Sequence, residues 1–230
     1  MANLNADYSA GLLRARPERI AAPSSAAPGR HPLGLENGRR DGALLVPDGL
    51  DPLRPAPLLV ALHGAGGVAT HIIDLVAQQA QAHGIIVLAP ESRGPTWDVI
   101  RGGYGPDVAF IDRALAKVFG LHPVDPARVA LSGFSDGASY ALSLGVINGE
   151  LFDHILAFSP GFMAPTQTAD TPRVFVSHGV HDEVLPIDPC SRRIVPALRR
   201  AGYDVEYHEF DGGHLVPPGM VERAVTRFLG

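Results

Sequence analysis

The feature that most constrains this chain is a regular alternation of short apolar runs with longer amphipathic segments. Runs of strand length cover residues 43–46, 58–62, 85–89, 129–131, 155–158, 174–177 and 204–210. Segments with helical periodicity cover residues 71–83, 107–119, 135–148, 187–201 and 218–229. Near-continuous apolar strands separated by amphipathic helices are typical of a mostly parallel sheet with helices on both faces. The sequence therefore predicts an α/β fold.

The N-terminal segment differs from this pattern. Residues 1–30 are rich in Ala, Pro, Ser and Arg and contain the stretch APSSAAPGR. Such a composition buries little apolar surface, so we expect residues 1–30 to form an N-terminal arm or a packed loop. Residues 31–230 have the length of one ordinary domain. Residues 158–173 have no clear helical period and are too few for a large lid domain, so we expect an open cleft.

The bulk composition narrows the class of partner. The chain has 46% hydrophobic and 19% charged residues, a net charge of −5 and a pI near 6.0. This balance gives no reason to expect nucleic acid or anionic lipid as a partner, and no apolar run reaches the ~18 residues that would span a bilayer. The first residues lack the pattern of a secretory signal. Cys190 is the only cysteine, so we expect a reducing, cytoplasmic location and no intrachain disulfide.

One turn from strand to helix has the features of a nucleophile site. In an open α/β sheet, right-handed crossovers place such turns along one edge, where ligands bind. The stretch VALSGFSDGASYALSL places Ser135 at such a turn, between Gly133 and Gly137. Small neighbours let the backbone turn sharply and expose the hydroxyl, and the following helix presents its positive end to developing negative charge. The pentapeptide alone is a weak signal. Its placement between a buried strand and a helix predicts Ser135 as a nucleophile.

A second turn, in LLVALHGAGG, is glycine-rich and follows a buried strand. A tetrahedral intermediate needs preorganised amide donors for its oxyanion, and glycines let the backbone approach closely. We assign these donors as the amides of Ala65 and Asp136. The alternatives are a plain turn or a phosphate-binding loop, but a Walker lysine is absent and GAGGVA does not fit G-x-G-x-x-G. His63 is expected to order this loop through hydrogen bonds.

Two further turns supply an acid and a base. Asp182 lies just beyond the strand that ends in VFVSHG, where a carboxylate can fix the tautomer of an imidazole. Glu183 and Asp188 are the rival acids, although Asp188 is also explained as a helix N-terminal residue. His214 lies in EFDGGHLVPPG, between the last strand and the last helix. Ten histidines are present, so this one means little without its neighbours.

Taken together, these motifs resemble the phospholipase/carboxylesterase branch of the α/β-hydrolases. This group includes acyl-protein-thioesterase-like and dienelactone-hydrolase-like enzymes. The resemblance covers residues 42–230 and rests on LLVALHGAGG, VLAPESRGPTWD, GFSDGASYALSL, FSPGFM, VSHGVHDEVLP and FDGGHLVPP. It implies the α/β-hydrolase fold and a triad in the chain order Ser135, Asp182, His214. Asp136 departs from the family pattern, because many relatives carry an uncharged residue after the nucleophile.

The resemblance and the residue chemistry predict a serine carboxylesterase that acts through an acyl-enzyme, with no metal or other cofactor. We expect a small-molecule ester, short-chain or aryl, as its substrate. Five residues on the triad's edge are predicted to line its pocket: Trp97, Phe134, Phe162, Met163 and Leu215. Thioesters, polyesters, feruloyl-type esters, peptides and acyl transfer to an alcohol are the alternatives for the same triad. A binding module without catalysis is the non-enzyme alternative.

Overall fold

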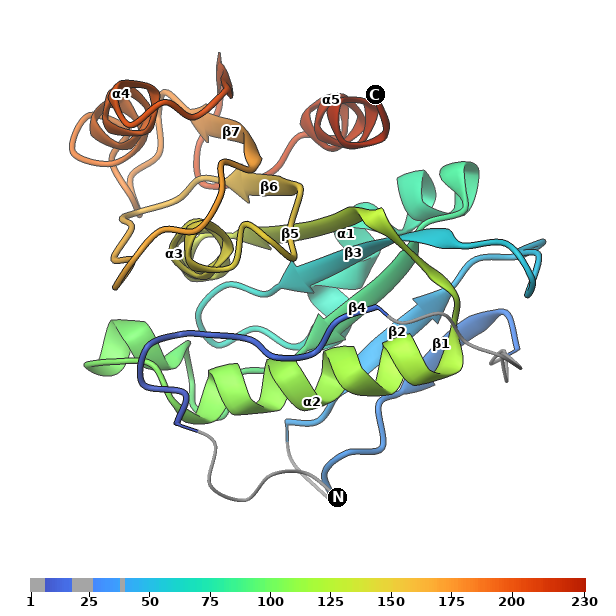
Figure 1. Ribbon diagram of the computed structural model, residues 1–230. Coiled ribbons are helices and arrows are strands. Elements are labelled where there is room, and N and C mark those ends of the chain that lie inside the picture. Colours follow the sequence, from blue (N-terminus) through green and yellow to red (C-terminus); the bar gives the residue numbers. More distant parts are fainter. Residues whose placement is uncertain (1–6, 18–26, 38–39) are drawn as a thin grey trace.

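A central sheet organises the molecule. The computed structural model describes residues 7–17, 27–37 and 40–230 (Figure 1). In this part of the chain eight strands form one sheet in the order β1-β2-β4-β3-β5-β6-β7-β8. Their bounds are β1 (Gly29–Pro32), β2 (Gly42–Val46), β3 (Ala56–Leu62), β4 (Ile86–Pro90), β5 (Val124–Phe134), β6 (His154–Phe158), β7 (Arg173–Gly179) and β8 (Val205–Phe210).

The pairing of the strands confirms a mostly parallel sheet. All pairs from β4 to β8 are parallel, whereas β1 pairs with β2, and β2 with β4, in antiparallel fashion. The carboxyl ends of β5, β7 and β8 therefore lie along one edge. The loops that follow these three strands contain Ser135, Asp182 and His214 respectively. The topology thus brings three distant parts of the sequence to the same edge of the sheet.

Helices cover both faces of the sheet, as predicted. They are α1 (Ala69–His83), α2 (Pro106–Leu121), α3 (Asp136–Ile147), α4 (Ser191–Arg200) and α5 (Pro218–Leu229), with a short 3-10 helix at Asp98–Arg101. Side chains of β3 alternate between two cores because successive residues of a strand point to opposite faces. Leu58 and Val60 belong to the core cluster that also contains residues of α2, α3 and α4, whereas Leu59 and Ala61 belong to the cluster that contains residues of α1 and α5. Among the described residues, no large lid stands over the strand ends.

The N-terminal residues 7–17 pack against α2 and α3. The Asp112 carboxylate accepts hydrogen bonds from the amides of Arg14 and Ala15, at 2.7 and 2.8 Å. The Asn148 side chain accepts one from the amide of Leu13, at 2.8 Å, and Leu13 is buried. Residues 1–6 and 18–26 of the predicted arm (1–30) lie outside the described residues.

Several predicted bounds need correction. Strand β1 was not predicted, because GRHP has no apolar run and its side chains are at most half-buried. Strand β5 begins at Val124 rather than at residue 129, since the exposed residues Pro126–Arg128 interrupt its apolar pattern. Helix α4 begins at Ser191 rather than at residue 187. The five predicted helices and the remaining strands agree with the structure to within about two residues at most ends, as boundary assignments generally do.

Candidate active site

The turn at Ser135 is sharply strained. Ser135 joins β5 to α3 with φ 58° and ψ −122°, a conformation that costs free energy and is rare outside functional sites. Its amide donates to the carbonyl of Phe158 at 2.9 Å, which fixes the turn to the neighbouring strand. The flanking glycines are required by close packing. A Cβ on Gly133 would lie 2.2 Å from the carbonyl oxygen of Gly137, and one on Gly137 would lie 2.2 Å from that of Leu62.

Three side chains form a hydrogen-bonded line at this turn. The Ser135 hydroxyl lies 2.8 Å from Nε2 of His214, and Nδ1 of His214 lies 2.6 Å from Oδ2 of Asp182. With Asp182 ionised, Nδ1 is the donor to the carboxylate and Nε2 accepts the hydroxyl proton. The Phe134 ring packs beside the imidazole, with 4.7 Å between the ring centroids. The imidazole is therefore held between the hydroxyl and the carboxylate.

The environment of Asp182 favours its ionised form. Burial opposes ionisation, but the hydrogen bond from His214 and the amides of Leu185 and Val184 outweigh it, so the pKa of Asp182 is lowered. The two amides donate to Oδ1 at 2.8 and 2.9 Å, which leaves Oδ2 for the imidazole. Asp182 is thus a charged acceptor in a fixed orientation.

A second histidine supports the acid. Nε2 of His178 lies 3.2 Å from Oδ2 of Asp182 and 2.8 Å from the carbonyl oxygen of Leu185, while Nδ1 lies 2.6 Å from the Ser191 hydroxyl. Burial is the largest influence on His178 and lowers its pKa, so the ring is neutral at pH 7. The structure places it behind the carboxylate, where its Nε2–H donates to the Leu185 carbonyl.

The rival acids lie in other surroundings. Glu183 is exposed. Asp188 is also exposed and accepts a hydrogen bond from Arg192 at 2.9 Å. Of the three acids considered, Asp182 is the one that the structure joins to His214.

The glycine-rich loop after β3 lies against the nucleophile turn. A Cβ on Gly64 would lie 3.3 Å from Cβ of Ser135, so this loop passes beside the serine. Among the described residues, the amides of Ala65 and Asp136 donate to no other protein group. Asp136 is also the first residue of α3, where helix amides have no intrahelical acceptor. Both amides therefore remain available as hydrogen-bond donors in the described part of the chain.

His63 orders this loop, as predicted. Its Nδ1 donates to the carbonyl of Gly64 at 2.7 Å, and its Nε2 accepts from the amide of Ser92 at 3.1 Å. Burial lowers the pKa of His63. A neutral ring with this tautomer satisfies both contacts, so His63 links the loop after β3 to the loop after β4.

Trp97 does not line a pocket, contrary to the prediction. Its side chain is 0% exposed, and its ring stacks on Tyr140 with 5.0 Å between centroids. Its indole N–H donates to the carbonyl of His63 at 2.9 Å. A large aromatic ring in an apolar setting with a satisfied N–H is well placed in a core. Trp97 therefore supports the loop from behind.

The other predicted lining residues reach the surface to different extents. Leu215 is 49% exposed, and it directly follows the imidazole in the chain. Phe162 and Met163 are half-buried in the segment after β6, and Met163 packs against the core. Phe134 lines a hollow beside the serine. We name this hollow the serine-side hollow.

The serine-side hollow has a volume of about 280 Å³. It is lined by His63, Gly64, Ala65, Gly67, His71, Ile72, Leu75 and Phe134. The sequence analysis missed the α1 residues among these. Their helical spacing predicts a buried face, and nothing in that pattern indicates that the face is left partly uncovered at the N-terminus of α1.

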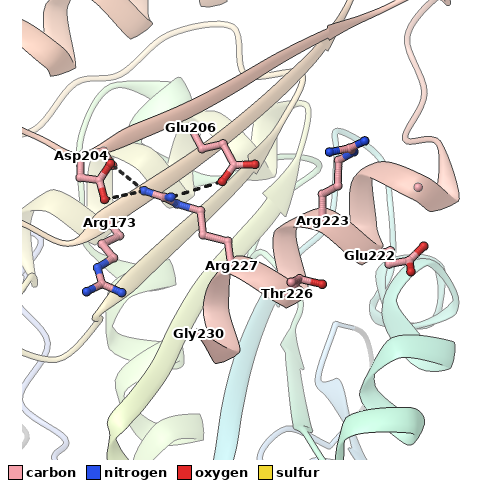
Figure 2. Close-up of a pocket in the computed structure, with 9 residues that line it drawn as sticks. Arg173, Asp204, Glu206, Glu222, Arg223, Thr226, Arg227 and Gly230 are labelled. Carbon is pink, nitrogen blue, oxygen red and sulfur yellow. Dashed lines mark hydrogen bonds and ion pairs between the residues drawn. The ribbon is translucent and has the colours of Figure 1, made fainter.

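A larger cleft lies at the opposite edge of the sheet. It has a volume of about 680 Å³ and lies between the amino ends of β7 and β8 and helix α5. Figure 2 shows Arg227 between Asp204 and Glu206, with which it forms ion pairs at 2.7 and 3.2 Å. We name this larger cleft the α5 cleft. It contains none of the predicted site residues.

None of the helices among the described residues combines the length and the apolar character needed to cross a membrane. In residues 7–17, 27–37 and 40–230, no group of three or more His, Cys, Asp or Glu side chains is arranged to hold a metal ion.

Comparison with known families decides the relationship of the chain. The family model described as phospholipase/carboxylesterase matches residues 108–229, which is just over half of the sequence and includes Ser135, Asp182 and His214. The chain belongs to this family. The turn at Ser135, Asp182 and His214 therefore lie within the region of this chain that the family model matches.

Individual relatives agree with this assignment. Feruloyl esterase C of Emericella nidulans is 31% identical over 160 residues, which cover 66% of this chain and 58% of that protein. The chain thus matches less than two thirds of the length of this relative. The crystal structure of esterase PE8 has a TM-score of 0.67 at 25% identity, covering 84% of this chain and 99% of that one. A ferulic acid esterase of Anaeromyces mucronatus, solved with ferulic acid, has a TM-score of 0.60 at 18% identity, covering 82% and 83%. These likenesses confirm the α/β-hydrolase fold.

Proposed function

We propose that this protein is a serine carboxylesterase in which Ser135, His214 and Asp182 form the catalytic triad. The observation that carries the proposal is the continuous hydrogen-bonded line from the hydroxyl through the imidazole to a buried carboxylate. This arrangement is what nucleophilic acyl transfer requires: a nucleophile, a base within reach and a group that orients the base. Membership of the phospholipase/carboxylesterase family supports the same reaction.

In the acylation step, Oγ of Ser135 attacks the carbonyl carbon of the ester while Nε2 of His214 takes the hydroxyl proton. The negative charge that forms on the carbonyl oxygen is stabilised by the amides of Ala65 and Asp136. Asp182 stabilises the imidazolium and holds its tautomer. Nε2 then gives the proton to the departing alkoxide, so an alcohol leaves and the acyl group stays on Ser135.

In the deacylation step, His214 removes a proton from water, and the resulting hydroxide attacks the acyl carbon. The second tetrahedral intermediate uses the same two amides. Its collapse returns the proton from Nε2 to Oγ of Ser135 and releases the carboxylic acid. All proton transfers run between His214, Ser135, water and the substrate, so this chain's own residues complete the cycle.

The serine-side hollow supports small acyl or aryl groups as the substrate class. Ile72 is buried, and Leu75 and Phe134 are half-buried, so the wall of the hollow is largely apolar. A volume of about 280 Å³ is at the low end for small-molecule sites. We infer short-chain or aryl esters, including the feruloyl type, which the name of the relative from Emericella nidulans also favours. Thioesters, polyesters and acyl transfer to an alcohol are outcomes of the substrate screen.

The proposal is tested with purified protein on p-nitrophenyl acetate, p-nitrophenyl butyrate and methyl ferulate. We expect turnover of at least one of these esters that is lost in Ser135→Ala, with the fold of the variant checked by circular dichroism. Loss of turnover with an intact fold identifies the serine as nucleophile. If the wild-type protein leaves all three esters unhydrolysed, the esterase proposal is wrong and a binding module is favoured.

A further inference from the structure

A carboxylate lies next to the nucleophile in the chain. Asp136 directly follows Ser135 and begins α3, and its side chain is half-buried. Its Oδ2 accepts a hydrogen bond from the Thr96 hydroxyl at 2.5 Å. The proposed mechanism uses only the amide of Asp136, so the carboxylate has no assigned role.

Thr96 is itself held in place. It lies in the loop after β4, between Pro95, whose carbonyl accepts from the amide of Gly66 at 2.7 Å, and the fully buried Trp97. The loop that offers the hydroxyl to Asp136 is therefore fixed to the loop that carries the proposed oxyanion donor Ala65. The carboxylate is preorganised beside the serine rather than free to swing away.

The charge of Asp136 is not neutralised by a cationic side chain. Among the described residues, no Lys, Arg or His lies within ion-pair distance of its carboxylate. The Arg101 guanidinium lies beside Gly94, in the loop that also carries Thr96, and forms no ion pair with Asp136. Two other arginines contact the same loop through groups away from Asp136. Arg40 donates to the Gly67 carbonyl at 3.1 Å, and Arg93 donates to the Glu91 carbonyl at 2.8 Å. The positive end of α3 offsets only about half a charge.

We propose that the Asp136 carboxylate, held by Thr96, makes the enzyme discriminate against esters that carry an anionic group near the scissile bond. The same charge favours neutral and cationic esters. This inference rests on the proposed esterase function and adds a substrate class to it. A second negative charge within about 6–8 Å of the carboxylate, partly screened by water, changes relative rates by about tenfold.

The experiment compares three esters that share a leaving group and differ in charge. They are p-nitrophenyl butyrate, mono-p-nitrophenyl succinate and p-nitrophenyl 4-(trimethylammonio)butyrate. For each variant, kcat/KM of the charged ester is divided by kcat/KM of p-nitrophenyl butyrate. Because the ratio is internal to each variant, a change in overall activity through the Asp136 amide cancels.

The variants are Asp136→Asn, Thr96→Val and Glu150→Gln. Asn keeps the shape and an acceptor for Thr96, and we expect the succinate ratio to rise about tenfold and the cationic ratio to fall. Thr96→Val frees the carboxylate and is expected to move both ratios in the same directions by a smaller factor. Glu150 is an exposed carboxylate just beyond the other end of α3, so Glu150→Gln removes an equal charge and should leave both ratios unchanged.

Salt gives an independent readout. In the wild-type protein, the succinate ratio should rise between about 0.02 and 0.5 M NaCl because screening weakens the repulsion, and it should be flat in Asp136→Asn. Unchanged ratios in Asp136→Asn, or equal changes in Glu150→Gln, would overturn the proposal while butyrate turnover still supports the esterase. If the wild type hydrolyses none of the three esters, the esterase proposal fails and this inference falls with it.

Discussion

The two hollows of this protein differ in what surrounds them. The α5 cleft has more than twice the volume of the serine-side hollow, at about 680 against 280 Å³. Three of its six charged side chains form ion pairs, as Arg227 does with Asp204 and Glu206, and the other three, Arg173, Glu222 and Arg223, form none with the described residues (Figure 2). The serine-side hollow adjoins a strained serine, an aligned imidazole and two unused amides. Volume alone would therefore select the wrong cleft.

The difference shows where this fold has backbone strain and hydrogen-bond donors that lack an acceptor. At the amino ends of the strands, Arg227 pairs with Asp204 and Glu206, and partly exposed ion pairs of this kind contribute little to stability. At the carboxyl ends, the backbone adopts a costly conformation at Ser135, and the amides of Ala65 and Asp136 have no acceptor among the described residues. Strain and unused donors persist where a substrate supplies the missing interactions. Matched substitutions in the α5 cleft and at the serine-side hollow are expected to have different effects.

The largest expected contrast comes from two Asp→Asn substitutions. Asp182→Asn should lower kcat on p-nitrophenyl acetate by about 10³–10⁴-fold with the fold intact, because the amide stabilises the wrong imidazole tautomer. Asp204→Asn breaks an exposed ion pair in the α5 cleft and should change kcat by less than about twofold. Steady-state kinetics and circular dichroism measure both. Near-full activity in Asp182→Asn would move the orienting acid to another residue.

Two Gly→Ala substitutions give the next contrast. In Gly137→Ala, the new Cβ would lie 2.2 Å from the Leu62 carbonyl oxygen, so the turn must shift. We expect a loss of about 3 kcal/mol or more in unfolding free energy and at least about 100-fold in activity. Gly219→Ala, in α5 beside the other cleft, meets no atom within 4 Å and should be neutral or stabilising. Urea unfolding and ester turnover test the pair; equal behaviour of the two variants would refute the packing argument.

These contrasts also show what the sequence could and could not predict. Ser135, Asp182 and His214 were predicted as a triad because parallel strands bring the loops that contain them to one edge, and because their chain order resembles that of the α/β-hydrolases. The structure places the three side chains in one hydrogen-bonded line. The sheet and helices followed from periodicity alone. Strand β1 was missed because an edge strand needs no apolar run.

Other features depend on how finished elements pack. The pattern of aromatic residues near the site suggested Trp97 as a lining residue, yet its ring lies wholly between His63 and Tyr140. Conversely, Ile72 and Leu75 have the spacing of ordinary core residues, and the hollow beside them exists because none of the residues that the structure describes fills it. Whether an apolar side chain meets the core or a cavity is decided by distant parts of the chain.

A size change within the serine-side hollow is expected to have a moderate effect. Leu75→Trp fills part of its 280 Å³ and should lower kcat/KM for p-nitrophenyl butyrate about tenfold relative to the acetate. Leu53→Trp places the same change on an exposed loop, where Leu53 is 79% exposed, and should leave the ratio unchanged. If both esters respond equally to Leu75→Trp, the hollow does not hold the acyl group.

The smallest predicted effect concerns how the free energy of unfolding depends on pH, through a carboxyl group in the same region as the candidate active site. Burial raises the pKa of Asp107 from 3.8 to about 6, and its carboxylate accepts a hydrogen bond from the amide of Asp98 at 2.7 Å. The folded state binds this proton more tightly than the unfolded chain does. The protonated Asp107 carboxyl therefore adds to the free energy of unfolding in full below pH 3.8, and this stabilisation is lost as the pH rises to about 6.

Differential scanning calorimetry between pH 4 and 7 tests this sign. In the wild-type protein, this carboxyl should lower Tm by a few degrees between pH 4 and 7. Asp107→Asn should lack this fall, even if the Tm of the variant differs from that of the wild type at every pH. Gly219→Ala, which changes no ionisable group, should keep the wild-type slope. An identical slope in Asp107→Asn would show that this carboxyl does not titrate there.

The central claim is that Ser135 is a nucleophile activated by His214, and covalent labelling tests it most directly. A fluorophosphonate probe should form a bond between its phosphorus and Oγ of Ser135, with loss of fluoride, and peptide mass spectrometry should locate the adduct in the GFSDG turn. Labelling should vanish in Ser135→Ala and slow strongly in His214→Ala. An unlabelled wild-type protein, or an adduct on a different residue, would contradict the account.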